Sequence, residues 1–295
     1  FAATANCIVF QGGRPVFADV DPDTLLLDPA QVEAKITPRT KAIIAVDYTG
    51  HPCDYDALRA IADRHDLILV ADACHSLGAR YRGRPVGSLA DMTVFSFHPV
   101  KHIATGEGGM VVTDRADWAR RLRMFRNHGI TTDYREREKS GSWFYEMVEL
   151  GFKYRLTDIQ CALGLSQMGK LPAWLRRRRE IAAAYRSAFA ALAGIQPLAV
   201  RPEVEHAYHL FVVRLGRKLD RGEVFRHLRR RGIGVNVHYI PVHLHAFYRK
   251  RLGTRPGECP AAEAAYGQII SLPMFAGLTN DDLSRVIAAV EEVVT

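Results

Sequence analysis

The sequence contains no apolar run near the ~20 residues that a helix needs to cross a membrane, so we expect no membrane-spanning segment. Cysteine is scarce, odd in number and scattered, without the close pairing of a metal site. This pattern argues against a disulfide framework and predicts reduced thiols in a cytoplasmic protein. No secretory signal is visible, and because the chain begins at Phe1 we expect its true N-terminus to be missing. The five cysteines are Cys7, Cys53, Cys74, Cys161 and Cys259.

Acidic residues are fewer than basic ones, with 32 Asp and Glu against 40 Lys and Arg, which gives a net charge of +8. This excess favours an anionic ligand, and phosphates are the first candidates. Much of it lies in the arginine runs 176–179 and 229–231, where helical patterns predict solvated faces. No aromatic residues are interleaved with these arginines, so we expect no nucleic-acid partner.

The first half of the chain alternates strand-like runs with helical patterns, which predicts an α/β architecture with a mostly parallel sheet. The expected strands cover residues 15–20, 40–47, 67–72, 92–97 and 110–113. The expected helices between and after them cover 28–36, 55–65 and 118–126.

A long helical pattern over residues 156–192, interrupted only at Pro172, predicts a connection between two domains. Beyond it, the patterns predict a small α+β domain with strands at 207–215 and 235–239 and helices at 221–231, 261–270 and 281–294. We therefore divide the chain into a large domain, 1–170, and a linking helix with a small C-terminal domain, 171–295.

Two polar residues lie where strands are expected to end. Asp72 closes the apolar run 67–71, and Lys101 follows the strand 92–97 within the loop 98–101. Ligands of open parallel sheets bind beyond the carboxyl ends of the strands. A strand-end acid commonly caps the next helix, and a loop lysine commonly only solvates, so neither residue predicts a function by itself.

Three segments together resemble the DegT/DnrJ/EryC1/StrS family of sugar aminotransferases. Residues 70–78 (VADACHSLG) resemble its cofactor-aspartate segment, and residues 95–101 (FSFHPVK) with 105–109 (TGEGG) resemble its lysine loop. Residues 151–160 (GFKYRLTDIQ) resemble a third hallmark, and the similarity runs from Phe1 to about Val294. The resemblance implies the aspartate-aminotransferase-like fold (type I), with a mostly parallel central sheet, a smaller C-terminal α+β domain and a truncated N-terminus.

The resemblance also implies pyridoxal 5′-phosphate as the cofactor. Lys101 would hold it as a Schiff base and, once displaced by the amino donor, act as the catalytic base, a role that suits a primary amine on a long stem. A desolvated, cation-rich pocket would lower the pKa of Lys101 toward working pH. Asp72 would keep the pyridine nitrogen protonated, His75 would hydrogen-bond the phenolic oxygen, and Ser96 would contact the phosphate.

Two further residues are implied at the cofactor. Phe1 matches an aromatic ring that the family places against the cofactor face, with a buried strand residue as the alternative. The family's Gly-Thr phosphate turn would precede Phe1, outside this chain. Lys153 stands where the family commonly has an asparagine that reaches the neighbouring subunit's cofactor phosphate, and a lysine can serve a phosphate as a point charge. We therefore expect a homodimer with shared active sites.

A histidine-rich stretch, residues 234–243 (GVNVHYIPVH), invites a metal hypothesis. His243 and His245 alternate as on a strand, but no carboxylate or cysteine joins them, so we expect no metal. The stretch resembles the family's substrate-facing loop, which implies His238 and Tyr239 as sugar contacts. The glycines of 106–109 open a strand rather than a helix, which argues against a phosphate cradle.

Four segments resemble one branch of the family, the UDP-4-amino-4,6-dideoxy-N-acetyl-β-L-altrosamine transaminases of pseudaminic acid biosynthesis. They are 51–54 (HPCD), 98–100 (HPV), 143–147 (WFYEM) and 234–243. This resemblance implies amino transfer from L-glutamate to the C4 ketone of a UDP-linked 4-keto-6-deoxy-N-acetyl hexose, a step toward surface glycans such as those of flagella.

Three alternatives stay open. A sibling nucleotide-sugar aminotransferase, of the lipid A 4-amino-arabinose or the perosamine type, is the nearest. A sugar dehydratase on the same scaffold typically has histidine in place of the lysine, so Lys101 argues against it, although His102 is adjacent. A non-catalytic regulator would be expected to carry a DNA-binding module, and none is visible in the sequence.

Overall fold

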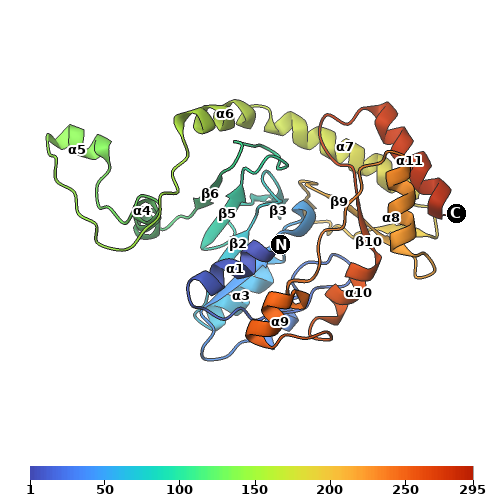
Figure 1. Ribbon diagram of the computed structural model, residues 1–295, viewed down its shortest axis with the longest axis horizontal. Helices are drawn as coiled ribbons and strands as arrows, with labels where there is room; N and C mark the ends of the chain where they lie inside the picture. The colour runs from blue at the N-terminus through green and yellow to red at the C-terminus, as the bar shows by residue number, and fades with distance from the viewer. Residues whose placement is uncertain (295) are drawn as a thin grey trace.

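The computed structural model describes residues 1–294, and a four-stranded sheet lies at the centre of its first half (Figure 1). The strand order is β1-β2-β5-β6. The first three strands are parallel, and β6 runs antiparallel to β5, so the predicted mostly parallel α/β sheet is confirmed. The strands are β1 (Ala42–Val46), β2 (Ile68–Asp72), β5 (Met92–Ser96) and β6 (Gly109–Val112).

Helices cover this sheet because their apolar residues recur on one face. In α3 (Tyr55–Arg64), Leu58, Ile61 and Ala62 are buried in the same core as the sheet residues. The helix begins where the Asp54 carboxylate accepts a hydrogen bond from the Ala57 amide at 3.2 Å. The other helices of this half are α1 (Ala2–Phe10), α2 (Pro29–Glu33), α4 (Ala116–Phe125) and α5 (Tyr134–Ser140).

The prediction of a strand at residues 15–20 is wrong. Only Val20 pairs, as an isolated bridge to Leu27. The segment instead delivers the buried Asp19 to a distant helix, where its carboxylate accepts hydrogen bonds from the amides of Ala261 and Ala262 at 2.8 and 3.0 Å. No neighbouring strand supplies a ladder, so the apolar pattern alone does not make a strand.

The long helical pattern is two helices, α6 (Asp158–Met168) and α7 (Leu171–Phe189), which lie end to end along one side of the molecule (Figure 1). Pro172 lies in the first turn of α7, where its missing amide hydrogen costs nothing. The first turns of α7 pack into the core of the sheet, whereas its later turns pack into a second core. The division at residue 170 falls between the two helices and stays a prediction.

The second core surrounds a three-stranded antiparallel sheet of order β10-β9-β7. Residues 235–239 do not form the predicted strand, because only Asn236 pairs, as an isolated bridge to Ser271. The predicted helix 261–270 ends earlier, and residues from Ile269 onward pair with β9 instead. The elements are β7 (Ile195–Pro197), β9 (Phe211–Leu215), α8 (Arg221–Arg230), α9 (Ala246–Leu252), α10 (Pro260–Gln268), β10 (Ile269–Leu272) and α11 (Asn280–Val294).

A small third sheet ties the second half of the chain to the first. It has the order β4-β3-β8, formed by β4 (Arg84–Pro85), β3 (Arg80–Tyr81) and β8 (Val204–Glu205). Two short 3₁₀ helices, η1 (Tyr48–Gly50) and η2 (Val242–Leu244), complete the elements. Among residues 1–294, no helix combines the length and apolar character needed to span a bilayer.

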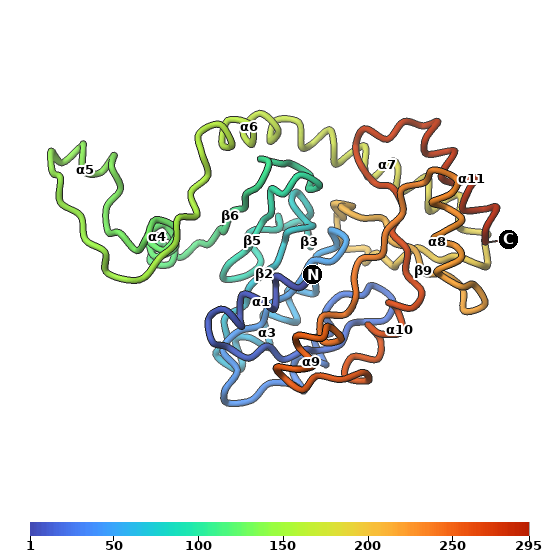
Figure 2. Tube along the Cα trace, in the orientation of Figure 1, coloured from blue at the N-terminus to red at the C-terminus, as the bar shows by residue number. Residues whose placement is uncertain are grey.

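One segment leaves the compact body. Residues 127–157, which include α5, form an arm that stands away from the sheets in the ribbon and in the Cα trace (Figure 1, Figure 2). The arm contains contacts of its own, such as the stacked rings of Phe152 and Tyr154 at 4.8 Å, and it is joined to α4 through the Phe152 amide, which donates to the Phe125 carbonyl at 2.7 Å. Its large apolar side chains are exposed, Trp143 at 85% and Leu150 at 83%.

Candidate functional site

The predicted site residues of the first half converge at the carboxyl edge of the central sheet. Asp72 ends β2, beside Val46 of β1 and Val94 of β5 in register. Ser96 ends β5, and Lys101 follows it by five residues. Because these three strands are parallel, their ends meet at one edge of the sheet.

The Asp72 carboxylate is held by two groups. The Thr4 hydroxyl donates to its Oδ2 at 2.6 Å, and the Cys74 amide donates to its Oδ1 at 3.3 Å. Thr4 lies on α1, which places the start of the chain over the end of β2. The carboxylate is thus fixed in direction before any ligand binds.

Lys101 lies in a turn whose backbone is closed by its own amide donating to the His98 carbonyl at 2.9 Å. Its side chain is half-buried, and this burial lowers the pKa of the ammonium below its ordinary value. The neighbouring Cys74 and Asp72 raise the same pKa. The expected lowering is therefore present, but it comes from desolvation and not from surrounding cations.

His75 is buried three residues after Asp72, between two aromatic side chains. Its Nε2 lies 3.5 Å from the Tyr239 hydroxyl, and its ring centroid lies 4.3 Å from that of His209. Burial, and then the positive charge of Lys101, lower the pKa of His75 well below its ordinary value, so the ring is neutral near pH 7. Its Nδ1 has no hydrogen-bond partner among residues 1–294.

Phe1 and the loop of His238 and Tyr239 close the site from the other side. Phe1 is 67% exposed as a residue and its ring lies 5.6 Å from the Tyr239 ring, so the alternative of a buried strand residue is wrong. His238 Nδ1 lies 2.8 Å from the Ser271 hydroxyl, and its carbonyl accepts a hydrogen bond from the Tyr48 hydroxyl. The structure therefore brings this loop to Asp72 and His75 across more than 150 positions of sequence.

Two further predicted residues, Ser96 and Lys153, differ from each other in position. Ser96 is half-buried, and its hydroxyl accepts from the His98 amide at 3.3 Å. Lys153 is exposed on the arm, where it pairs through its backbone with Asn127. No contact within residues 1–294 joins the Lys153 side chain to Asp72, His75 or Lys101.

The arrangement fits pyridoxal phosphate. The cofactor requires an amine for its aldehyde, a carboxylate for its ring nitrogen and a hydrogen-bond partner for its phenolic oxygen. Lys101 supplies a half-buried amine with a lowered pKa, and Asp72 supplies an oriented carboxylate. The unpartnered ring nitrogen of the buried His75 is the kind of polar atom that a bound ligand satisfies.

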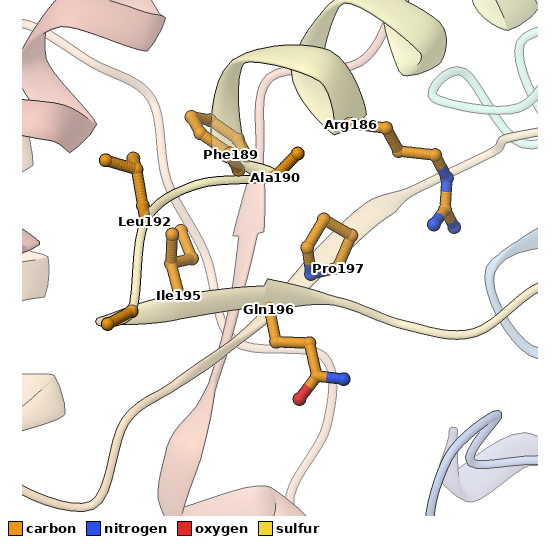
Figure 3. Close-up of a pocket in the computed structure, with 8 residues that line it drawn as sticks. Arg186, Phe189, Ala190, Leu192, Ile195, Gln196 and Pro197 are labelled. Atoms are coloured by element: carbon orange, nitrogen blue, oxygen red, sulfur yellow. The ribbon is translucent and has the colours of Figure 1, made fainter.

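Two hollows lie in the second half of the chain. One of about 470 Å³ adjoins the site, because His209 and His238 line it together with Asn236 and Ser271. The other, of about 420 Å³, lies at the end of α7 around Phe189 and Ile195 (Figure 3). None of the predicted site residues lines this second hollow, and its one charged side chain, Arg186, donates to the Leu198 carbonyl at 2.6 Å.

The arginine run 176–179 is not a solvated face throughout. Arg178 is buried, and its guanidinium donates to the carbonyls of Tyr208 and Met274, both at 2.9 Å. Burial lowers the pKa of Arg178 to about 10. Arg178 thus fixes the segment that carries His209, beside His75.

His243, which invited the metal hypothesis, pairs with a carboxylate instead. His243 is buried, and its Nε2 lies 2.8 Å from the Glu263 carboxylate. Within residues 1–294 no group of three or more histidine, cysteine or acidic side chains is arranged to hold a metal ion.

Several residues at this site were not predicted from the sequence. Thr4, His209 and Tyr48 belong to segments without a recognised motif, and their contacts to Asp72, His75 and His238 span large sequence separations. One signal in the sequence could have indicated Tyr48. The pair Asp47-Tyr48 lies at the end of an expected strand, and Asp72 was recognised because it also lies at a strand end.

Comparison with known proteins adds independent findings. Residues 1–291 match the model of the DegT/DnrJ/EryC1/StrS aminotransferase family. The chain is 40% identical to the spore coat polysaccharide biosynthesis protein SpsC of Bacillus subtilis, over 100% of this chain and 77% of SpsC.

Solved structures resemble it over the same extent. PseC of Helicobacter pylori, an aminotransferase involved in the biosynthesis of pseudoaminic acid, superposes with a TM-score of 0.93 and 33% identity over 100% of this chain and 77% of PseC. Spr1654 of Streptococcus pneumoniae is a candidate sugar aminotransferase solved in its PMP form. It superposes with a TM-score of 0.93 and 33% identity over 100% of this chain and 79% of Spr1654.

Proposed function

The chain belongs to the DegT/DnrJ/EryC1/StrS aminotransferase family, and from that premise we propose that it aminates the C4 ketone of a UDP-linked 4-keto-6-deoxy-N-acetyl hexose with L-glutamate as donor. It is a pyridoxal-phosphate-dependent sugar aminotransferase of fold type I. The observation that carries the proposed site is the meeting of Lys101, Asp72 and His75 at one sheet edge.

Each of these residues has a distinct task. Bound pyridoxal phosphate supplies a carbon that exchanges amines and a ring that withdraws electrons. Lys101 Nζ would hold the cofactor and, once free, would serve as the base that moves a proton at the sugar C4. Asp72 would keep the proton on the ring nitrogen, and Thr4 holds the Asp72 carboxylate in place for this task. His75 would hydrogen-bond the phenolic oxygen, and Ser96 would contact the phosphate.

We propose that the enzyme is a homodimer in which Lys153 serves the cofactor phosphate of the other subunit. The arm and α6 expose Trp143, Leu150 and Ile159, each by more than 80%. Apolar surface of this extent typically marks an interaction site, and a second copy can cover it symmetrically. Lys153 lies on this arm, away from its own subunit's Asp72. The active site that it can reach is therefore that of a partner subunit.

The substrate assignment rests on the loop of His238 and Tyr239. Both face the site, and the hollow of about 470 Å³ that His238 lines has the size of a ligand pocket. The likeness to PseC, which acts in pseudoaminic acid biosynthesis, supports the same branch for this chain. We also propose a cytoplasmic location, which a nucleotide-linked substrate and the free thiols support.

A sibling aminotransferase is the second candidate, supported by the 40% identity to SpsC, a protein of spore coat polysaccharide biosynthesis. A dehydratase is disfavoured because Lys101 is present and the neighbouring His102 is buried. The His102 Nε2 lies 3.0 Å from the Ala207 carbonyl, which occupies it structurally.

Product analysis separates these candidates. The purified enzyme is given L-glutamate and a panel of UDP- and dTDP-linked 3-keto and 4-keto sugars, with Lys101→Ala as the inactive control. We expect an amino group at C4 of the UDP-linked N-acetyl sugar. Preferential amination of a dTDP sugar, or amination at C3, would contradict the proposed substrate and leave the aminotransferase assignment intact.

A further inference from the structure

A second carboxylate lies beside Asp72 and points into the protein. Asp47 directly follows β1, whose last residue Val46 pairs with Asp72, and its side chain is 0% exposed. Transfer of a carboxylate into the interior is costly unless its oxygens are hydrogen-bonded. An unpaired acid at this depth therefore requires a structural or functional reason.

Three donors converge on this carboxylate. Its Oδ1 accepts from the Tyr55 hydroxyl at 2.8 Å and the Cys53 amide at 3.0 Å, and its Oδ2 accepts from the Ser76 hydroxyl at 2.6 Å. An ionised carboxylate only accepts, so this set of donors suits the charged form. Burial nevertheless raises the pKa of Asp47 to about 7, while these hydrogen bonds lower it.

The two oxygens face two different parts of the protein. Oδ1 holds the start of α3, where Tyr55 is the first helical residue. Oδ2 holds Ser76, the direct neighbour of His75. The Asp47 amide also donates to the Asp72 carbonyl at 3.0 Å, so Asp47 is bonded to both ends of the segment Asp72–Ser76.

This segment is braced from a second side. Gly50 has a φ of +100°, and a Cβ added there would lie 2.7 Å from the His75 carbonyl oxygen. A side chain at position 50 would therefore push His75 out of place. The Ser76 amide closes the turn by donating to the Ala73 carbonyl at 3.0 Å.

We propose that Asp47 is a positioning residue, whose Oδ2 holds Ser76 so that Asp72 and His75 face the cofactor together. The inference rests on the proposed site, in which both residues contact pyridoxal phosphate. At metal sites, removal of a group that orients the binding residues typically costs about 10- to 100-fold in affinity or activity, and we expect an effect at the lower end of that range here.

The two oxygens of Asp47 offer a matched pair of variants. Ser76→Ala removes one hydrogen bond on the cofactor side, and Tyr55→Phe removes one from the same carboxylate on the side of α3. Thermal unfolding of both apoproteins reports the structural loss, and we expect similar reductions in Tm. Titration of each apoprotein with pyridoxal phosphate, followed by fluorescence, gives the dissociation constant.

We expect Ser76→Ala to weaken cofactor binding by about tenfold and to shift the pH profile of the visible absorbance, while Tyr55→Phe stays within about twofold of wild type. Equal dissociation constants and equal pH profiles in the two variants would overturn the inference, because a purely structural carboxylate would affect both alike. The proposed site is tested separately by Lys101→Ala. If that variant kept the visible absorbance, the site assignment would fail, and this inference with it.

Discussion

The sheet edge and the arm both carry residues of the proposed active site, and they differ in how the chain holds them. At the sheet edge, Asp72 and His75 are fixed by Thr4, Ser76 and the buried Asp47. On the arm, residues 127–157 expose their large apolar side chains to solvent and leave Lys153 without a side-chain partner among residues 1–294.

The difference teaches which steps each region controls. A carboxylate and an imidazole that are oriented before binding lower the free-energy cost of forming the reactive arrangement. Lys153, in contrast, can serve a cofactor phosphate only once a partner subunit covers the arm. We therefore expect changes at the sheet edge to affect the chemistry, and changes on the arm to affect assembly and phosphate binding.

Lys101→Ala should have the largest effect. Without the primary amine the cofactor has no covalent attachment, so we expect the visible absorbance and the transamination to be lost together. Lys139→Ala, an exposed lysine on α5, is the matched control and should retain both. Comparable activity in the two variants would place the essential amine elsewhere.

Asp72→Asn should keep the cofactor attached and slow the proton transfer on the order of 100-fold, because a neutral pyridine withdraws electrons poorly. Thr4→Val removes only the hydrogen bond at 2.6 Å and should have a smaller effect of the same kind. Single-turnover measurement of the amino-donor half-reaction separates this step from substrate binding. A normal rate in Asp72→Asn would mean that another group holds the ring nitrogen.

On the arm, Lys153→Ala should raise the dissociation constant of pyridoxal phosphate by about tenfold and leave the dimer intact, since it removes one point charge from a phosphate. Leu150→Asp should instead favour the monomer, because it places a charge within the exposed apolar surface. Sedimentation gives the mass and fluorescence titration gives the affinity. A monomeric wild-type protein would exclude the shared site.

The pH dependence of the free energy of unfolding should show the smallest effect, and it tests the buried carboxylate of Asp47. Asp47 has a folded pKa of about 7, raised by burial above the ordinary 3.8, so its contribution to stability is present at low pH and is lost as pH rises through about 7. Asp72, Tyr55 and Cys53 are the titratable groups around it. Buried His102 acts in the opposite direction, because burial lowers its pKa to about 3.

As the pH rises from about 5 to about 8, the free energy of unfolding should therefore fall less in Asp47→Asn than in wild type. We expect the two falls to differ by at most a few kcal/mol. Urea unfolding at the two pH values gives this difference. Parallel losses in the two proteins would show that Asp47 does not titrate in this range.

The sequence predicted the parts of the site that lie within short motifs. Asp72 ends a strand that an apolar run identifies, His75 and Lys101 follow such strands, and the family resemblance implies their roles. The strands at 15–20 and 235–239 were wrong because strand formation depends on a neighbouring strand that local pattern does not reveal.

Contacts between distant segments could not be predicted. Thr4 meets Asp72 across 68 positions, and Arg178 meets the Met274 carbonyl across 96. Arg178 lies in a run of four arginines that predicts a solvated face, and only the packing of α7 against the segments before β9 and after β10 surrounds it with carbonyls. Asp47 was not recognised because its three donors come from a loop, a helix and a turn.

The most direct test of the central claim is to locate the cofactor on the chain. Borohydride reduction of the purified protein makes the lysine linkage permanent, and peptide mass mapping then identifies the modified residue. We predict that the pyridoxyl group is found on Lys101 alone. Its presence on Lys153 or another lysine, or its absence from every peptide, would contradict the proposed site.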